Sequence, residues 1–184
     1  NFIYTEKGIY NTKKNQAKLV KKSYIRYQNQ LIEGDSLYYD RNREFSSATR
    51  NIKVTDSINK SVLKGDYGEI YRKKDSIYIT KRAVIINKTD SDSIYLHAKQ
   101  FIVTGKTKER IIKGYPNVRI WSTEVSGKCD TIHSIEKDGL TKMIGRPILW
   151  NKTNQLTGDL IHLIADKNSK ELDFVEEPKI KKIY

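Results

Sequence analysis

Cysteine, proline and glycine are scarce in this sequence. The 184 residues include one cysteine, three prolines and ten glycines. A single cysteine excludes an internal disulfide, and we expect Cys129 to be a small buried strand residue rather than a reactive thiol. Because proline and glycine do not cluster, no linker or low-complexity segment divides the chain. Length and composition therefore predict one domain, residues 1–184, that is large enough to bury a core.

Long apolar runs and targeting features are also missing. No run approaches the roughly 18 apolar residues that a membrane-spanning helix needs. The chain begins at Asn1 without an initiator methionine, a basic segment or the apolar segment of a signal peptide, as in a mature or trimmed chain. Neither observation assigns a compartment.

The residue combinations that catalysis and metal binding require are absent from the sequence as well. His97, His133 and His162 are isolated from one another and from Cys129, so no zinc-type spacing predicts a metal site. The sequence also lacks a Gly-x-Ser-x-Gly elbow and a phosphate-binding loop. We therefore expect a protein that is not an enzyme and that has no metal or other cofactor.

A repeated Gly-Asp step is the most informative feature that the sequence does contain. It occurs at Gly34-Asp35, Gly65-Asp66 and Gly158-Asp159. Gly65 follows Gly34 by 31 residues, and Gly158 follows it by 124, which is four times 31. Self-similarity at a fixed period indicates one supersecondary unit stacked along an axis. Glycine adopts unusual backbone angles and aspartate bonds local amides, so we interpret these steps as turns rather than as a catalytic carboxylate set.

The hydrophobic pattern has the period of β-strands. Apolar and polar residues alternate at 51–55, 75–80 and 117–121, and clusters of turn-forming residues separate such stretches. No helical apolar stripe extends beyond about two turns. The pattern predicts an all-β, antiparallel fold of about a dozen strands.

The net charge of +13 is the second strong feature. Glu6 is the one acidic residue among the lysines of the first thirty positions. Such an excess attracts polyanions, for example anionic glycolipids or nucleic acid, although a solvated basic surface has the same composition. The sequence has no recognised nucleic-acid-binding motif, but tyrosine-rich strands could form a stacking platform for single strands.

The Gly-Asp steps and the strands between them resemble a known family. The segments 31–40, 51–54, 63–68 and 156–166 are similar to the alternating Gly-Asp and Asn-Val-x-Ile cadence of the OstA/LptA family of lipopolysaccharide-transport proteins. The resemblance covers most of the chain, from about residue 3 to 175. It departs from the family near Leu96, where the Gly-Asp step is missing, and in its high lysine content.

This resemblance implies a periplasmic protein with a slit-tube β-jellyroll, whose apolar groove shields the acyl chains of lipid A and which helps to bridge the inner and outer membranes. Alternating apolar residues would line that groove, although the same residues would also fill an ordinary sandwich core. The expected groove residues are Leu37, Ile52, Val54, Leu63, Ile77, Ile79, Ile85, Phe101, Val103, Val118, Ile120, Ile148, Trp150, Leu160, Ile164 and Phe174. The expected phosphate contacts, near one mouth of the groove, are Lys18, Lys21, Lys22 and Arg26.

The partners that the resemblance implies are lipopolysaccharide and homologous jellyroll domains. Unpaired strand edges at the ends of the sandwich would join such domains edge to edge, either with relatives or in a homo-oligomer. We expect no nucleic-acid partner. The alternative function is a basic β-sandwich that binds another polyanion, such as single-stranded nucleic acid.

Overall fold

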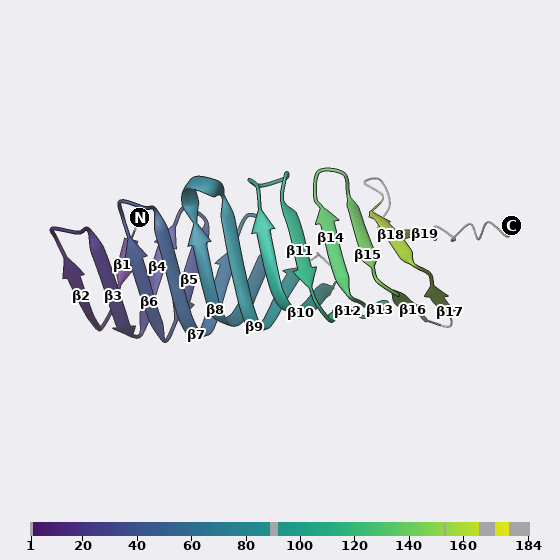
Figure 1. Ribbon diagram of the computed structural model, residues 1–184, viewed down its shortest axis with the longest axis horizontal. Helices are drawn as coiled ribbons and strands as arrows, with labels where there is room; N and C mark the ends of the chain where they lie inside the picture. The colour runs from purple at the N-terminus through teal and green to yellow at the C-terminus, as the bar shows by residue number, and fades with distance from the viewer. Residues whose placement is uncertain (1, 89–91, 153, 166–171, 177–184) are drawn as a thin grey trace, which may run out of the picture.

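The chain forms an elongated stack of antiparallel strands. The computed structural model describes residues 2–88, 92–152, 154–165 and 172–176, and for residues 165 and 172–176 it describes the backbone alone. These residues form nineteen strands and one short 3-10 helix, η1 (Arg72–Lys74). The strands follow one another along the long axis from the N-terminal to the C-terminal end (Figure 1). The all-β class is confirmed, with more strands than the dozen expected.

Strand pairing divides the stack into two layers. Four long strands bend from one layer into the other: β7 (Phe45–Asp56), β8 (Ser61–Tyr71), β9 (Ser76–Lys88) and β10 (Ser93–Thr104). The first layer also contains β2 (Lys7–Asn11), β3 (Gln16–Lys21), β6 (Ser36–Asp40), β11 (Ile111–Tyr115), β14 (Thr131–Ile135), β15 (Leu140–Ile144), β18 (Leu160–Ala165) and β19 (Leu172–Glu176). The second layer also contains β1 (Phe2–Tyr4), β4 (Ser23–Tyr27), β5 (Gln30–Gly34), β12 (Val118–Trp121), β13 (Val125–Cys129), β16 (Ile148–Asn151) and β17 (Asn154–Thr157).

The chain crosses between the layers at one long edge of the molecule, which we call the corner edge. Crossings from the second layer to the first are at Glu6, Asp35, Asp66, Lys99, Asp130 and Asp159. Crossings in the opposite direction are at Lys22, Arg50–Asn51, Lys81–Arg82, Asn117 and Gly145–Arg146. The Gly-Asp steps therefore lie at corners between the layers, but the turn prediction holds only in part: Gly65 and Asp66 belong to the continuous strand β8, and neither Gly34 nor Gly65 has a positive φ angle.

Local backbone geometry makes these corners possible. Arg50, Arg82 and Asn117 have φ angles of 60°, 57° and 59°, in the left-handed region that lets a strand change direction within one or two residues. In β7 the pairing register with β8 shifts at this point, between Thr49 and Ile52, so the strand bends without ending.

Hairpin turns occupy the opposite edge, which we call the slit edge. In Figure 1 the turns of the first layer, including η1 between β8 and β9, lie along the upper margin. The turns of the second layer are separate from them, for example residues 57–60 between β7 and β8. No described strand crosses between the layers at this edge, so the two layers meet there through side chains.

The apolar core lies between the two layers and runs along the stack. Phe101, Ile85, Ile132, Met143 and Ile161 are among its fully buried side chains. Eleven of the expected groove residues belong to this core: Leu37, Ile52, Val54, Leu63, Ile77, Ile79, Ile85, Phe101, Val103, Val118 and Ile120. Their inward orientation follows from the strand period of two. Their lipid-binding role stays a prediction.

The expected inward orientation was wrong for residues of the C-terminal strands. Trp150 in β16 and Ile164 in β18 are each 37% exposed. Ile148 lies two residues before Trp150, and Leu160 lies four residues before Ile164, so each shares the outer face of its strand. Buried instead are Leu149, Ile161 and Leu163. These strands are apolar at consecutive positions, so their sequences do not indicate which alternate set faces inward. The side chain of Phe174 lies outside the described residues.

Candidate functional site

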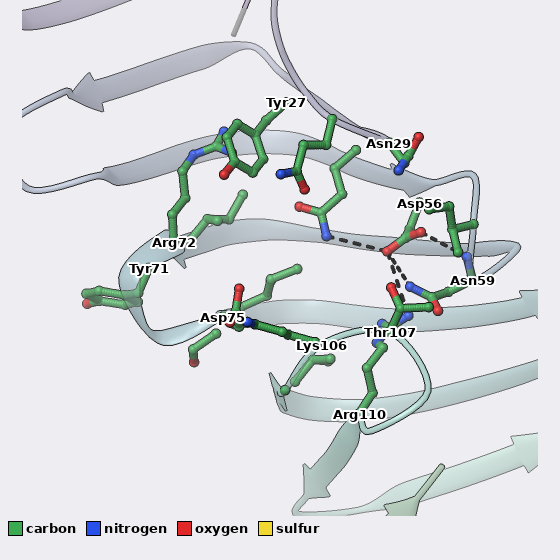
Figure 2. A pocket seen from close by; sticks show the side chains of 18 residues that line it. Tyr27, Asn29, Asp56, Asn59, Tyr71, Arg72, Asp75, Lys106, Thr107 and Arg110 are labelled. Atoms are coloured by element: carbon green, nitrogen blue, oxygen red, sulfur yellow. Dashed lines mark hydrogen bonds and ion pairs between the residues drawn. The ribbon is translucent and has the colours of Figure 1, made fainter. Parts of the chain in front are cut away.

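A pocket of about 570 Å³ opens at the slit edge, between hairpin turns of the two layers. Figure 2 shows it from close by, with side chains reaching into it from both layers. The second layer contributes residues 27–30 together with Asp56, Ile58 and Asn59, and the first layer contributes residues around η1 and from the β10–β11 turn. The site therefore combines segments that are far apart in the sequence.

The pocket reaches the apolar core. Its lining includes Ile70, Ile77 and Val103, which are buried members of the core cluster. Two of them, Ile77 and Val103, are opposite each other on β9 and β10. An apolar group that entered at the slit edge would therefore contact core side chains directly.

One end of the pocket is closed by a compensated ion pair. Arg110, which is 8% exposed, extends from the first layer to Asp56 at the end of β7, with 3.8 Å between the nearest nitrogen and oxygen. It also donates a hydrogen bond to Ser61 (3.3 Å). The Asp56 carboxylate accepts further hydrogen bonds from Asn59 (2.8 Å) and Gln30 (3.4 Å). Figure 2 shows the interactions of Asp56 in this network, and the pairing of Arg110 with Asp56 leaves no net charge at this end.

The other end of the pocket is formed by Arg72 and Tyr27. Arg72, in η1 of the first layer, places its guanidinium carbon 3.6 Å from the centre of the Tyr27 ring, in the second layer. Burial lowers the pKa of Arg72 from its usual value. All three guanidinium nitrogens are buried, and none has a hydrogen-bond partner of standard geometry within the described structure, whereas the neighbouring Tyr39, Tyr27 and Glu44 partly offset the lowering of the Arg72 pKa by burial. The two ends of the pocket thus differ in charge compensation.

The residues expected to contact phosphate are not gathered at this pocket. Lys21 and Lys22 lie at the corner edge, where both form ion pairs with Glu6 (3.3 and 3.0 Å). Lys18 and Arg26 are exposed on the outer faces of different layers. Their role in phosphate binding stays a prediction, but the structure does not make them one cluster.

Sequence reasoning missed Arg72, Arg110 and Tyr27. Residues 72–75 look like an ordinary turn, in which nothing distinguishes Arg72 from the two lysines that follow it. Arg110 stands next to Glu109, and no local pattern indicates that its partner is Asp56, 54 residues away in the sequence. The positions of these residues depend on the two layers facing each other, and no local pattern reports that arrangement.

No catalytic constellation is formed by the three Gly-Asp carboxylates. Asp35 accepts hydrogen bonds from Asn51, whereas Asp66 is bonded to Arg82, and Asp159 lies at a third corner near the C-terminal end. Within the described residues, no group of three histidine, cysteine or acidic side chains could hold a metal ion. No helix of the described chain is long and apolar enough to cross a membrane.

Comparison with solved structures identifies the architecture. The chain matches the crystal structure of LptH from Pseudomonas aeruginosa, which is described as the LptA-homologous periplasmic component of the lipopolysaccharide transport device. The match has a TM-score of 0.57 and 12% sequence identity, and it covers 82% of this chain and 96% of that chain. The chain has the LptA-like fold. Neither a family model nor a curated protein matches its sequence.

Proposed function

We propose that this protein is a periplasmic carrier of lipopolysaccharide that shields lipid A acyl chains between its two layers and does not alter them chemically. The observation that carries the proposal is an LptA-like fold whose apolar core is reached by a pocket at the slit edge. Each acyl methylene transferred from water to such an interior contributes about 0.8 kcal/mol, so binding needs no catalytic group.

The hairpin turns of the two layers are separate at the slit edge, and this supports exchange of bound acyl chains there. Side chains such as Arg110 and Asp56 connect the layers there, whereas continuous backbone connects them at the corner edge. Separation at the slit edge therefore breaks side-chain contacts and leaves the strand pairing within each layer intact. A lipid acyl chain could replace core contacts between the layers in this open form.

Photo-crosslinking from adjacent positions on one strand tests the proposal. Ile77 faces the pocket, whereas Tyr78 is half-buried on the opposite side of β9. We expect benzoylphenylalanine at position 77 to capture lipopolysaccharide and the same residue at position 78 to capture little. Val118 and Arg119 give a second matched pair, buried and exposed, in the second layer on β12, which pairs with β10. Equal capture at inward and outward positions would contradict binding between the layers.

A titration with oligonucleotides distinguishes the alternative polyanion. Single-stranded nucleic acid would bind through exposed lysines and arginines, and its affinity would fall steeply with salt. Acyl chains buried between the layers would be retained at high salt, because hydrophobic burial is not screened. Tight oligonucleotide binding without capture of lipopolysaccharide from position 77 would replace the carrier proposal.

We further propose that the strand edges at the N-terminal end join this protein to jellyroll partners or to a second copy. β2 is exposed along its whole length, and its Ile9 side chain is 76% exposed. An exposed strand edge is a template for pairing with another chain. We expect Ile9→Asp to weaken self-association in sedimentation velocity, with Ile144→Asp, an exposed change on β15 away from the pocket and from the N-terminal end, as control. A monomer at all concentrations that also binds no jellyroll partner would refute this.

A further inference from the structure

We propose that the slit pocket contains a phosphate-binding site at Arg72, which receives the phosphorylated headgroup of an amphiphile whose apolar part enters the core. The inference rests on the proposed carrier function for the identity of the amphiphile. The site itself rests on the geometry of Arg72, Tyr27 and the pocket floor.

The first argument is the unused hydrogen-bonding capacity of Arg72. Its guanidinium carries five N–H donors, and all three nitrogens are buried without a hydrogen-bond partner in the described structure. Burying a charge without an anionic partner is costly, and stacking on the Tyr27 ring offsets part of that cost. A bound anion would satisfy the donors that the protein leaves unsatisfied.

The second argument is that the chain holds Arg72 at this place. The Arg72 amide donates to the Glu44 carbonyl (3.1 Å), and the Asp75 amide donates to the Arg72 carbonyl (3.1 Å). Asp75 has a left-handed φ of 42° that closes the turn. The guanidinium thus extends from a fixed turn in the first layer to Tyr27 in the second (Figure 2). Its position is therefore set by the fold, unlike that of a freely moving surface arginine.

The third argument is the charge distribution around the pocket. Arg110 is compensated by Asp56 at the far end. Asp75 and Lys106, both exposed at the rim, carry opposite charges. Arg72 therefore accounts for the remaining positive charge of the lining itself. Glu44 lies just outside the lining and raises the Arg72 pKa through its charge, but it forms no ion pair with the guanidinium among the described residues, so an anion would be attracted to the Tyr27 end.

The shape of the site favours a phosphate on an amphiphile over a free anion. A planar guanidinium presents paired N–H groups that match two oxygens of a phosphate. The apolar floor formed by Ile70, Ile77 and Val103 belongs to the same pocket. A ligand with a phosphate and an acyl chain would use both parts, whereas inorganic phosphate would use the Arg72 end alone.

Binding of phosphorylated and dephosphorylated lipid A to three proteins tests the inference. These are the unmodified protein, Arg72→Gln, and the control Arg41→Gln, which changes an exposed arginine in the neighbouring β6–β7 turn. We expect Arg72→Gln to weaken binding of phosphorylated lipid A about tenfold or more and to leave dephosphorylated lipid A unchanged. Arg41→Gln should change neither. Arg72→Lys, which keeps the charge but loses the planar fork, should fall between.

Two outcomes would overturn the site and leave the carrier function standing. One is that Arg72→Gln binds phosphorylated lipid A as well as the unmodified protein does. The other is that Arg72→Gln loses both lipids equally, together with a lower thermal stability, which would make Arg72 a structural clasp on Tyr27.

A probe that needs no lipid makes the site testable even if the carrier function fails. Addition of inorganic phosphate should shift the Arg72 Nε–H resonance in a saturable way, and the Arg41 resonance should not follow it. Saturable shifts without any lipid binding would support the phosphate site and refute the amphiphile. No shift at Arg72 with phosphate or with lipid A would refute the site.

Discussion

The two long edges of the molecule differ in how completely their charged side chains are paired. Along the corner edge, acidic residues mark most crossings into the first layer and basic residues mark most crossings back, and the pairs are close. Asp66, for example, accepts two hydrogen bonds of 2.6 Å from Arg82. At the slit edge, Arg110 is paired across the layers but Arg72 has no anionic partner within 4.0 Å among the described residues.

This difference indicates which edge supports the fold and which edge is free to bind. Corner charges lie beside continuous backbone, so their pairs adjust a connection that already exists. At the slit edge, Arg110 contacts the opposite layer directly, and Arg72, which forms no ion pair among the described residues, is the arginine that we propose binds a ligand. Changes at the two edges should therefore have unequal consequences.

If both edges enclose one core, truncating a residue at its centre should cause the largest loss of stability. Phe101 is such a residue. Phe101 is fully buried against Gly114 on β11, where an added Cβ would overlap its ring. We expect Phe101→Ala to lower the free energy of unfolding by about 3–5 kcal/mol, measured by chemical denaturation. Tyr95→Ala, an exposed change on the same strand, should cost less than about 1 kcal/mol. Equal costs would argue against a shared core.

Removing one arginine from each edge should have unequal effects on stability. Arg110→Ala would leave the buried Asp56 carboxylate with hydrogen bonds but without its cation, and we expect a loss of about 2 kcal/mol. Hydrogen exchange should accelerate in the slit-edge turns and remain unchanged at the corners. Arg82→Ala removes an exposed partner of Asp66, so the loss should be smaller. A larger loss for Arg82→Ala would reverse our assignment of the two edges.

Acid should weaken the corner edge through Asp66. Hydrogen bonds from Arg82 lower the pKa of Asp66 below its usual value. Because the folded-state pKa is lower than the unfolded one, the ionised carboxylate stabilises the fold at neutral pH, and this contribution is lost as the pH falls through the folded-state pKa. We expect Asp66→Asn to be less stable than the unmodified protein at pH 7 and to match it in strong acid. A difference that grows with acidity would contradict this sign.

The sequence predicted the repeat because the corners are local. Gly34 and Gly65 are 31 residues apart since that interval holds one hairpin of the first layer, β6 with β7, and one hairpin of the second, β7 with β8. The missing third Gly-Asp step corresponds to the corner at Lys99. Alternation likewise identified the inward residues of β7, where Lys53 and Thr55 are the outer neighbours of Ile52 and Val54; in β9 and β10 outer positions such as Val84 and Ile102 are apolar as well.

The C-terminal face and the slit pocket could not be predicted, for physical reasons. Ile148, Leu149 and Trp150 are all apolar, and a shift of one residue exchanges the faces of a strand. The Arg72–Tyr27 contact joins residues 45 positions apart through the meeting of two layers. Local sequence patterns carry information on strands and corners, whereas the meeting of the slit edges depends on the whole stack.

Cys129 offers a comparison of the two edges without changing stability. It is the last residue of β13, next to the corner at Asp130, and burial raises the pKa of its thiol to about 12. Since the thiolate is the reactive form, we expect a thiol reagent at pH 8 to leave Cys129 unmodified until the protein unfolds. In Ile58→Cys, the new thiol replaces a side chain that is exposed at the slit edge and should react at once. Mass spectrometry after brief labelling separates the two sites, and rapid modification of Cys129 in the native protein would show that the core next to this corner opens to solvent without unfolding.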